Sequence, residues 1–234
     1  MADQFDTEAE NTEPAQALLT PVEARILGAL MEKQRATPDY YPMTLNALVQ
    51  ACNQKTSRSP VMQLTPGEAG HTVNQLRDRE LIRASFHGRA ERYEQRLTNR
   101  LELDLREAAA LCVLILRGPQ TLGEIRTNSA RLTEFPDLGS VSETLELLMA
   151  REPALVQRLR RAAGHREERF AHLLCGEPHP DDLETGPKPG ARAEDDQALG
   201  VLRQEVKQMR AELDALWQLT GLAEQRPSAE SNQD

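Results

Sequence analysis

The stretch Leu19-Thr20-Pro21-Val22-Glu23-Ala24 decides the fold, because it recurs further along the chain as Leu103-Asp104-Leu105-Arg106-Glu107-Ala108. In each copy a residue able to cap a helix, Thr20 or Asp104, is followed three residues later by a glutamate. In such a capping box, each of the two side chains accepts a hydrogen bond from a backbone N–H that the first helical turn leaves without a partner. Apolar residues at spacings of three and four follow both boxes, so we expect a helix to begin at each.

Two further helices are expected after each of these first helices. The apolar spacing predicts second helices over about residues 44–52 and 121–130. The third helices are expected to begin at two more capping boxes, Thr65-Pro66-Gly67-Glu68 and Ser140-Val141-Ser142-Glu143. The inner faces of these third helices are formed by Ala69, Val73 and Leu76 in one and by Val141, Leu145 and Leu148 in the other.

A hairpin pattern follows each third helix. The first runs from Leu81-Ile82-Arg83-Ala84-Ser85 to Glu91-Arg92-Tyr93, and the second from Leu155-Val156-Gln157-Arg158-Leu159 to Glu168-Arg169-Phe170. An isolated hairpin is not stable in water, so each is expected to pack on its three helices. Three helices followed by a hairpin is the order of a winged helix. We therefore predict a mainly α fold with small β-hairpins, made of two winged-helix (helix-turn-helix) domains in tandem.

Charge is distributed unevenly along the chain. The 234 residues include 28 Lys and Arg against 37 Asp and Glu, a formal net charge of −9. Residues 20–100 carry 12 basic and 8 acidic residues, a net charge of 12 − 8 = +4. Of the folded segments, only this one is expected to attract a polyanion.

Composition also divides the chain into segments. The first 18 residues contain no Lys or Arg and few apolar side chains, and residues 177–196 are rich in Pro, Gly and Asp. We expect a disordered acidic tail (1–18), a first winged-helix domain (19–100), a second (101–176), a linker (177–196), a C-terminal heptad helix (197–221) and a disordered tail (222–234).

The C-terminal segment has the apolar pattern of a coiled coil. Its a and d positions are Leu199, Leu202, Val206, Met209, Leu213 and Leu216. Glu205 and Arg210 occupy the g and e positions that pair across a parallel two-stranded coil, which favours a homodimer. So short a coil is marginal on its own, and the alternative is one amphipathic helix that folds back onto its own domain. Both interpretations remain open.

The sequence contains no motif typical of an enzyme, so we do not expect catalysis or a cofactor. A nucleophile elbow, a Walker loop, a zinc-protease motif and a dinucleotide fingerprint are all absent. His172, Cys175 and His179 have metal-binding side chains, but their spacing along a strand does not bring them to one point. Cys52 and Cys112 are expected as small core residues. Three scattered cysteines and the lack of a long apolar run predict a cytoplasmic protein outside the membrane.

One stretch carries a family resemblance. Thr37-Pro38-Asp39-Tyr40-Tyr41-Pro42, followed by Ala51-Cys52-Asn53-Gln54-Lys55, Arg58 and Pro60-Val61-Met62, resembles the YceH-like family of uncharacterised bacterial proteins. The resemblance covers roughly residues 19–220. It implies a tandem winged-helix fold, a cytoplasmic setting and a C-terminal helix, and it supplies no established activity.

The first domain is the candidate for binding double-stranded DNA. In a helix-turn-helix the third helix enters the major groove, and here its outward positions include His71, Asn74 and Gln75. Asn and Gln side chains can form paired hydrogen bonds with adenine. The cations expected to contact phosphate are Lys55, Arg58, Arg83, Arg89 and Arg92.

Acidic residues weigh against this interpretation. Asp78 and Glu68 lie on or beside the same face of the third helix and would repel phosphate. The alternative is that the arginines form a solvated surface, some of them paired with Glu91 and Glu94. Arg92 in particular has a structural alternative, because its counterpart Arg169 also precedes an aromatic residue.

The second domain presents a different outer surface. On its third helix the outward positions include Glu143, Glu146 and Leu147, which suit a protein interface better than a DNA groove. The leading hypothesis is a DNA-associated, regulatory protein that dimerises through the second domain and the C-terminal helix. The alternative is an adaptor that binds no DNA and uses its winged helices and C-terminal helix to bind a protein partner.

Overall fold

The computed structural model describes residues 17–87, 90–159, 167–178 and 208–209. The chain divides into two compact units, residues 1–186 and 187–234, and only residues 208–209 of the second unit are described. Most of the acidic tail, most of the linker and all but two residues of the heptad helix therefore lie outside the described residues.

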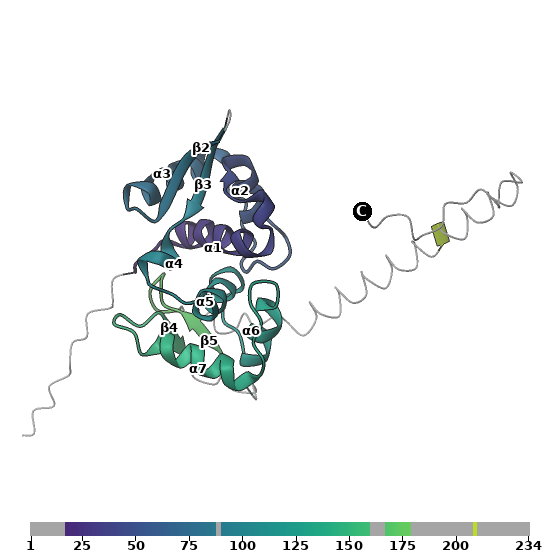
Figure 1. Cartoon of the computed structure of the whole chain (residues 1–234), viewed down its shortest axis with the longest axis vertical. Coiled ribbons are helices and arrows are strands. Elements are labelled where there is room, and N and C mark those ends of the chain that lie inside the picture. Colours follow the sequence, from purple (N-terminus) through teal and green to yellow (C-terminus); the bar gives the residue numbers. More distant parts are fainter. Residues whose placement is uncertain (1–16, 88–89, 160–166, 179–207, 210–234) are drawn as a thin grey trace, which may run out of the picture. The chain divides into compact units, whose positions relative to one another are not determined.

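The first half of the compact unit 1–186 contains three helices followed by an antiparallel hairpin, in the predicted order (Figure 1). Its elements are α1 (Pro21–Ala36), η1 (Pro38–Tyr40), β1 (Met43–Thr44), α2 (Leu45–Cys52), α3 (Pro66–Asp78), β2 (Ile82–His87) and β3 (Ala90–Gln95). The sheet has the order β1-β3-β2, with Met43 opposite Tyr93. The two-residue strand β1 was not predicted from the sequence.

The second half repeats this order after a short connecting helix. Its elements are α4 (Leu97–Arg100), α5 (Leu105–Arg117), α6 (Leu122–Ser129), α7 (Leu138–Met149), β4 (Val156–Arg158) and β5 (Phe170–His172). An isolated bridge between Gln120 and Phe170 takes the place that β1 has in the first half. The described part of the chain is therefore mainly helical, with two small antiparallel sheets.

Capping boxes begin both first helices, as predicted. At α1 the Glu23 carboxylate accepts a hydrogen bond from the Thr20 backbone N–H at 2.7 Å, and the Thr20 hydroxyl accepts one from the Glu23 N–H at 3.3 Å. Asp104 and Glu107 form the same pair of bonds at α5.

The capping box predicted at Ser140 is wrong. Helix α7 begins at Leu138, and Asp137 is its N-cap, with its carboxylate accepting from the Ser140 N–H at 2.7 Å. Aspartate is as good a cap as serine, and the two residues between Asp137 and Ser140 can adopt helical geometry. Ser140 therefore lies inside the first turn.

The repeat extends to an ion pair that joins the end of each third helix to the start of each first helix. Arg79 contacts Glu23 at 2.7 Å, and Arg151 contacts Glu107 at 2.9 Å. Both arginines also donate to a backbone carbonyl in the segment just before the first helix. Each glutamate therefore has two roles: it belongs to the capping box of a first helix, and it forms an ion pair with the arginine that follows the third helix.

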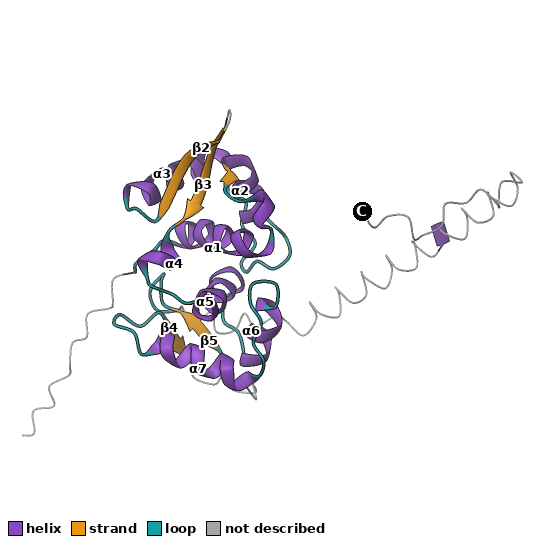
Figure 2. Cartoon of the chain, in the orientation of Figure 1, coloured by secondary structure: helices purple, strands orange, loops and turns teal. Residues whose placement is uncertain are grey.

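Helices α1 and α5 pack against each other at the centre, between the two sheets (Figure 2). Every residue of α1 from Glu23 to Met31 is buried. A Cβ atom on Gly28 would lie 2.7 Å from Ile115 Cγ2, so any other residue at this position would force Ile115 or one of the two helices to shift. The buried apolar residues of both halves form one hydrophobic core. The boundary predicted near residue 100 therefore separates two repeats but not two cores.

None of the described helices combines the length and the apolar sequence that crossing a bilayer requires.

Candidate nucleic-acid interface

Helix α3 presents the outward face that the sequence predicted. His71, Asn74 and Gln75 are exposed, whereas the inner positions of the helix are buried. The side chains of these three residues form no hydrogen bond or ion pair with any other residue in the described part of the chain. Asp78 is exposed as well. The face therefore offers two amides and an imidazole to a partner, and the exposed carboxylates of Glu68 and Asp78 lie towards the two ends of the helix.

The β2–β3 hairpin lies beside α3 (Figure 1). An ion pair of 3.6 Å between Arg77 and Glu91 links the two elements. The Arg83 side chain is 65% exposed and lies 3.7 Å from Glu94. Exposed pairs at such distances contribute little to stability, so these arginines can exchange a carboxylate for another anion at small cost. Arg89 lies outside the described residues.

Arg92 has a structural role in the hairpin. It is half-buried and donates a hydrogen bond to the Pro42 carbonyl oxygen at 2.9 Å. Its counterpart Arg169 donates to the Pro119 carbonyl oxygen at 2.7 Å. Arg92 thus connects β3 to the segment before α2, and Arg169 connects the start of β5 to the segment before α6. The contacts support the structural alternative for Arg92.

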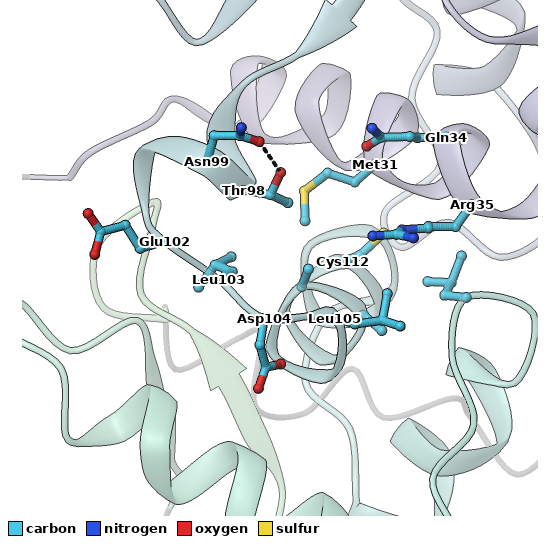
Figure 3. A pocket seen from close by; sticks show the side chains of 13 residues that line it. Met31, Gln34, Arg35, Thr98, Asn99, Glu102, Leu103, Asp104, Leu105 and Cys112 are labelled. Carbon is cyan, nitrogen blue, oxygen red and sulfur yellow. Dashed lines mark hydrogen bonds between the residues drawn. The ribbon is translucent and has the colours of Figure 1, made fainter.

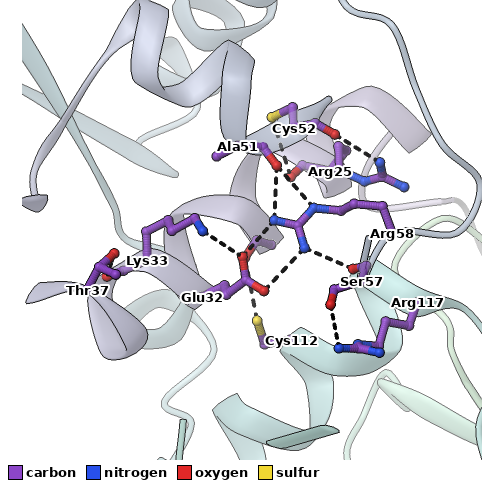
Figure 4. Close-up of polar contacts among 11 residues, drawn as sticks. Arg25, Glu32, Lys33, Thr37, Ala51, Cys52, Ser57, Arg58, Cys112 and Arg117 are labelled. Atoms are coloured by element: carbon purple, nitrogen blue, oxygen red, sulfur yellow. Dashed lines mark hydrogen bonds and ion pairs between the residues drawn. The ribbon is translucent and has the colours of Figure 1, made fainter. Parts of the chain in front are cut away.

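The expectation that Arg58 contacts phosphate is wrong. Its side chain is fully buried and is bonded to Glu32 through both carboxylate oxygens, at 3.2 and 2.6 Å (Figure 4). The remaining N–H groups donate to the carbonyl oxygens of Ala51 and Ser57. Every N–H of the guanidinium is therefore engaged inside the protein.

Lys55 is exposed but does not join the α3 face. It lines a cleft of about 660 Å³ together with residues of α1, α5 and α6, and no residue of α3 or of the hairpin lines that cleft. The structure therefore groups His71, Asn74 and Gln75 on α3. It places Arg83 on the neighbouring hairpin, on the opposite side of β2 from the buried Ile82, and Lys55 and Arg58 elsewhere.

An exposed aromatic side chain near the hairpin tip was not predicted as part of this surface. Phe86 on β2 is 78% exposed and lies opposite Glu91 of β3. Strand alternation places it on the same side as Ile82, which is buried against the helices. That alternation could have identified Phe86, because the hairpin extends beyond the helices that cover Ile82.

The residues that carry the family resemblance build the loop between α2 and α3. The Asn53 side chain exchanges two hydrogen bonds with the Leu64 backbone, each of 2.8 Å, and so closes the loop. The Ser59 N–H donates to the Leu116 carbonyl oxygen at 2.8 Å, and Arg117 donates to the Ser57 hydroxyl at 2.7 Å. The loop therefore braces the first half against α5 of the second.

The ionisation of Glu32 is coupled to this loop. Burial alone would raise the pKa of Glu32, but the hydrogen bonds and the positive charge of Arg58 outweigh burial and hold that pKa below its ordinary value. The carboxylate is thus held in its charged form by a loop that lies 26 residues further along the chain.

The stabilising contribution of this pair is expected to disappear in acid. A carboxyl group with a lower pKa in the folded chain stabilises it fully above the unfolded pKa of about 4.3, and the contribution is lost as pH falls through the folded value. Urea unfolding should give a difference in stability between the natural chain and Glu32→Gln that is constant from about pH 7 to 5 and shrinks below about pH 4. A difference that persisted unchanged at about pH 3 would contradict this assignment.

The outer face of α7 is exposed as predicted. Glu143, Glu146 and Leu147 all face solvent, and Leu147 is 58% exposed. Their use as a protein interface stays a prediction. Met209 is exposed. The other heptad residues, Leu199, Leu202, Val206, Leu213 and Leu216, lie outside the described residues.

A pocket of about 340 Å³ lies between α1, α4 and α5 (Figure 3). Cys112 lines it, and its thiol donates to the Gly28 carbonyl oxygen at 3.5 Å. Burial raises the pKa of Cys112 well above its ordinary value, so it is held as a neutral thiol and is not an activated nucleophile. In the described part of the chain, no three His, Cys, Asp or Glu side chains lie close enough together to hold a metal ion.

These observations define a mainly helical protein with two repeats of three helices and a hairpin, an exposed polar helix face and a strongly braced loop. Residues 19–165 match the model of a family described as DUF480, protein of unknown function. A UPF0502 protein of Cellvibrio japonicus is 48% identical over 171 residues, which cover 73% of this chain and 77% of the relative. One of Geobacter sulfurreducens is 49% identical over 177 residues (75% and 81%), and one of Pseudomonas aeruginosa is 53% identical over 156 residues (67% and 70%).

The chain belongs to this DUF480 (UPF0502) family of uncharacterised bacterial proteins. The match confirms the resemblance to an uncharacterised bacterial family that the sequence showed.

Proposed function

We propose that the chain is a tandem winged-helix protein that binds double-stranded DNA through α3 and the β2–β3 hairpin. The observation that carries the proposal is the exposed face of His71, Asn74 and Gln75, whose side chains are engaged by no other described residue. A helix with amide side chains on its outer face suits the major groove, where Asn and Gln can read adenine. Such a face has no other evident use within the described fold.

The charges of the hairpin support a weak, salt-sensitive contact with phosphate. Arg83 and Arg77 are exposed, and their ion pairs within the described residues, with Glu94 and Glu91, are long. Binding DNA requires these pairs to open, and the released glutamates then oppose the phosphates. We therefore expect few phosphate contacts, low affinity for random DNA, and specificity that depends on the amides of α3.

Substitution of the α3 amides tests the proposal. Asn74→Ala and Gln75→Ala are each expected to weaken binding to a selected duplex by about 1–3 kcal/mol, while affinity for random duplex changes little. Arg83→Glu is expected to weaken both and to flatten the dependence of affinity on salt between about 50 and 200 mM. Fluorescence anisotropy on duplexes selected from a random library measures both effects.

The second repeat supplies matched controls. Glu143→Ala and Glu146→Ala change the exposed face of the corresponding helix, α7, and should leave DNA affinity unchanged. No detectable binding at about 50 mM salt, or equal loss with the α7 variants, would exclude this function.

The exposed Leu147 favours a second candidate, in which α7 binds a protein partner. An apolar side chain that is 58% exposed on the same face as Glu143 and Glu146 resembles an anchor at an interface. The simplest partner is a second copy of the chain, with the heptads of residues 199–216 completing the dimer. Light scattering should then give a dimer mass for the natural chain and a smaller mass for Leu147→Asp. A monomer in both cases would remove this candidate.

A further inference from the structure

A cavity of about 490 Å³ lies between the two repeats, beside the start of α1. Most of its lining is apolar and includes Ala24 and Met62 from the first half and Ile115 and Ala171 from the second. A largely apolar cavity of this size with a few polar groups is typical of a binding site for a small molecule. The lining contains no residue of α3 or of the β2–β3 hairpin, so this site is distinct from the proposed DNA-binding face.

Arg25 gives this cavity an unusual polar group. It lines the cavity, yet the residue is only 2% exposed. Its terminal N–H groups donate to the carbonyl oxygens of Cys52 at 3.1 Å and of Pro60 at 2.7 Å, and Pro60 lines the cavity too. The Nε–H is buried and has no hydrogen-bond partner among the residues that the structure describes.

The charge of Arg25 also lacks a counter-ion. Within the described residues no carboxylate lies within 4.0 Å of it, whereas the other buried arginine, Arg58, is paired with Glu32. Burial lowers the pKa of Arg25, and the nearby charge of Arg58 lowers it further. An arginine still keeps its proton in a protein, so the charge persists without compensation. A buried donor of this kind requires an explanation, and a bound acceptor supplies one.

We propose that this cavity binds a small monocarboxylate with an apolar body. The carboxylate accepts hydrogen bonds from the guanidinium of Arg25, whose planar array of donors suits a carboxylate. The hydrocarbon part packs on Ala24, Met62 and Ile115. Glu177 also lines the cavity, and its negative charge opposes a dianion such as a phosphate monoester more strongly than it opposes a monocarboxylate.

Occupation of the cavity would stabilise the folded chain. The ligand contacts residues of both repeats, and those contacts exist only when the repeats are packed together. The proposal does not depend on DNA binding, because its readout is direct binding of the small molecule.

Isothermal titration calorimetry of the full chain with octanoate, 1-octanol and inorganic phosphate tests the proposal. Octanoate is expected to bind at least about tenfold more tightly than 1-octanol, because only the carboxylate pairs with Arg25. Phosphate is expected not to bind. Arg25→Met should bind octanoate and 1-octanol equally.

Two further variants keep the test valid if Arg25→Met does not fold. Ala24→Leu keeps Arg25 but fills the apolar part of the cavity, and it should weaken octanoate binding about tenfold or more with an unchanged circular dichroism spectrum. Ala150→Leu, at an exposed position at the end of α7, should bind octanoate as the natural chain does.

Four results would overturn the proposal: no binding of octanoate to the natural chain, equal binding of 1-octanol, tighter binding of phosphate, or equal binding by Ala24→Leu. Octanoate binding that appears only after deletion of residues 179–234 would also overturn the proposal. It would mean that these residues, and not a small carboxylate, occupy the cavity in the full chain.

Discussion

Glu32→Gln is expected to lower the free energy of unfolding by about 3–5 kcal/mol, the usual result of removing one partner of a buried ion pair. Glutamine has the shape of glutamate but neither its charge nor its second acceptor oxygen. The fully buried guanidinium of Arg58 would lose its only counter-ion within the described residues. The nearby charge of Arg25 would make that loss more costly, because two cations would then lie together in the interior.

Urea unfolding followed by circular dichroism measures this change. Glu143→Gln is the matched control, because Glu143 is exposed on α7 and its substitution should change stability by less than about 0.5 kcal/mol. A loss below about 1 kcal/mol for Glu32→Gln would mean that the pair contributes no more than a surface ion pair.

Gly28→Leu is expected to lower the free energy of unfolding by about 3 kcal/mol, because it overpacks the contact between the two central helices. Even a Cβ atom here would lie 2.7 Å from Ile115 Cγ2 and 3.0 Å from Leu116 Cδ2. Ile115 is β-branched and sits within a helix, so its methyl group has little freedom to move away. The same measurement of urea unfolding applies.

A pair of alanine variants separates packing from helix propensity. Replacing a glycine within a helix by alanine gains up to about 1 kcal/mol of propensity at either position. At Gly70 in α3 the new Cβ would lie 3.5 Å from Leu45 Cδ2, an ordinary contact, so Gly70→Ala should be stabilising. Gly28→Ala has to overcome the close contact with Ile115 and should be destabilising. Equal effects at the two positions would contradict the close approach of α1 and α5.

The features predicted correctly from the sequence are those that depend on neighbouring residues. A capping box requires only residues three apart, and the boxes at Thr20, Thr65 and Asp104 are all present. The exposed face of α3 follows from helical spacing in the same way. Asp137 and Ser140 lie three residues apart, and both can cap a helix. The sequence pattern predicted Ser140 as the N-cap of α7, whereas the N-cap in the structure is Asp137.

The features that were missed depend on contacts between distant residues. Arg58 looks like a surface cation in the sequence, and only its partner Glu32, which lies 26 residues earlier, makes it internal. The role of Gly28 depends on Ile115 in the other repeat. Arg92 is an exception, because its counterpart Arg169 in the sequence already indicates a structural role, which the contact with the Pro42 carbonyl oxygen supports.

The paired arginine contacts give the two repeats the same internal framework. Arg79 with Glu23 and Arg151 with Glu107 hold each copy of the framework in the same way, and none of these residues lies on an outer helix face. The contacts that hold the framework are therefore separate from the residues that face outward on α3 and α7. The two repeats accordingly share one framework and present different outer faces, with asparagine and glutamine on α3 and glutamate and leucine on α7.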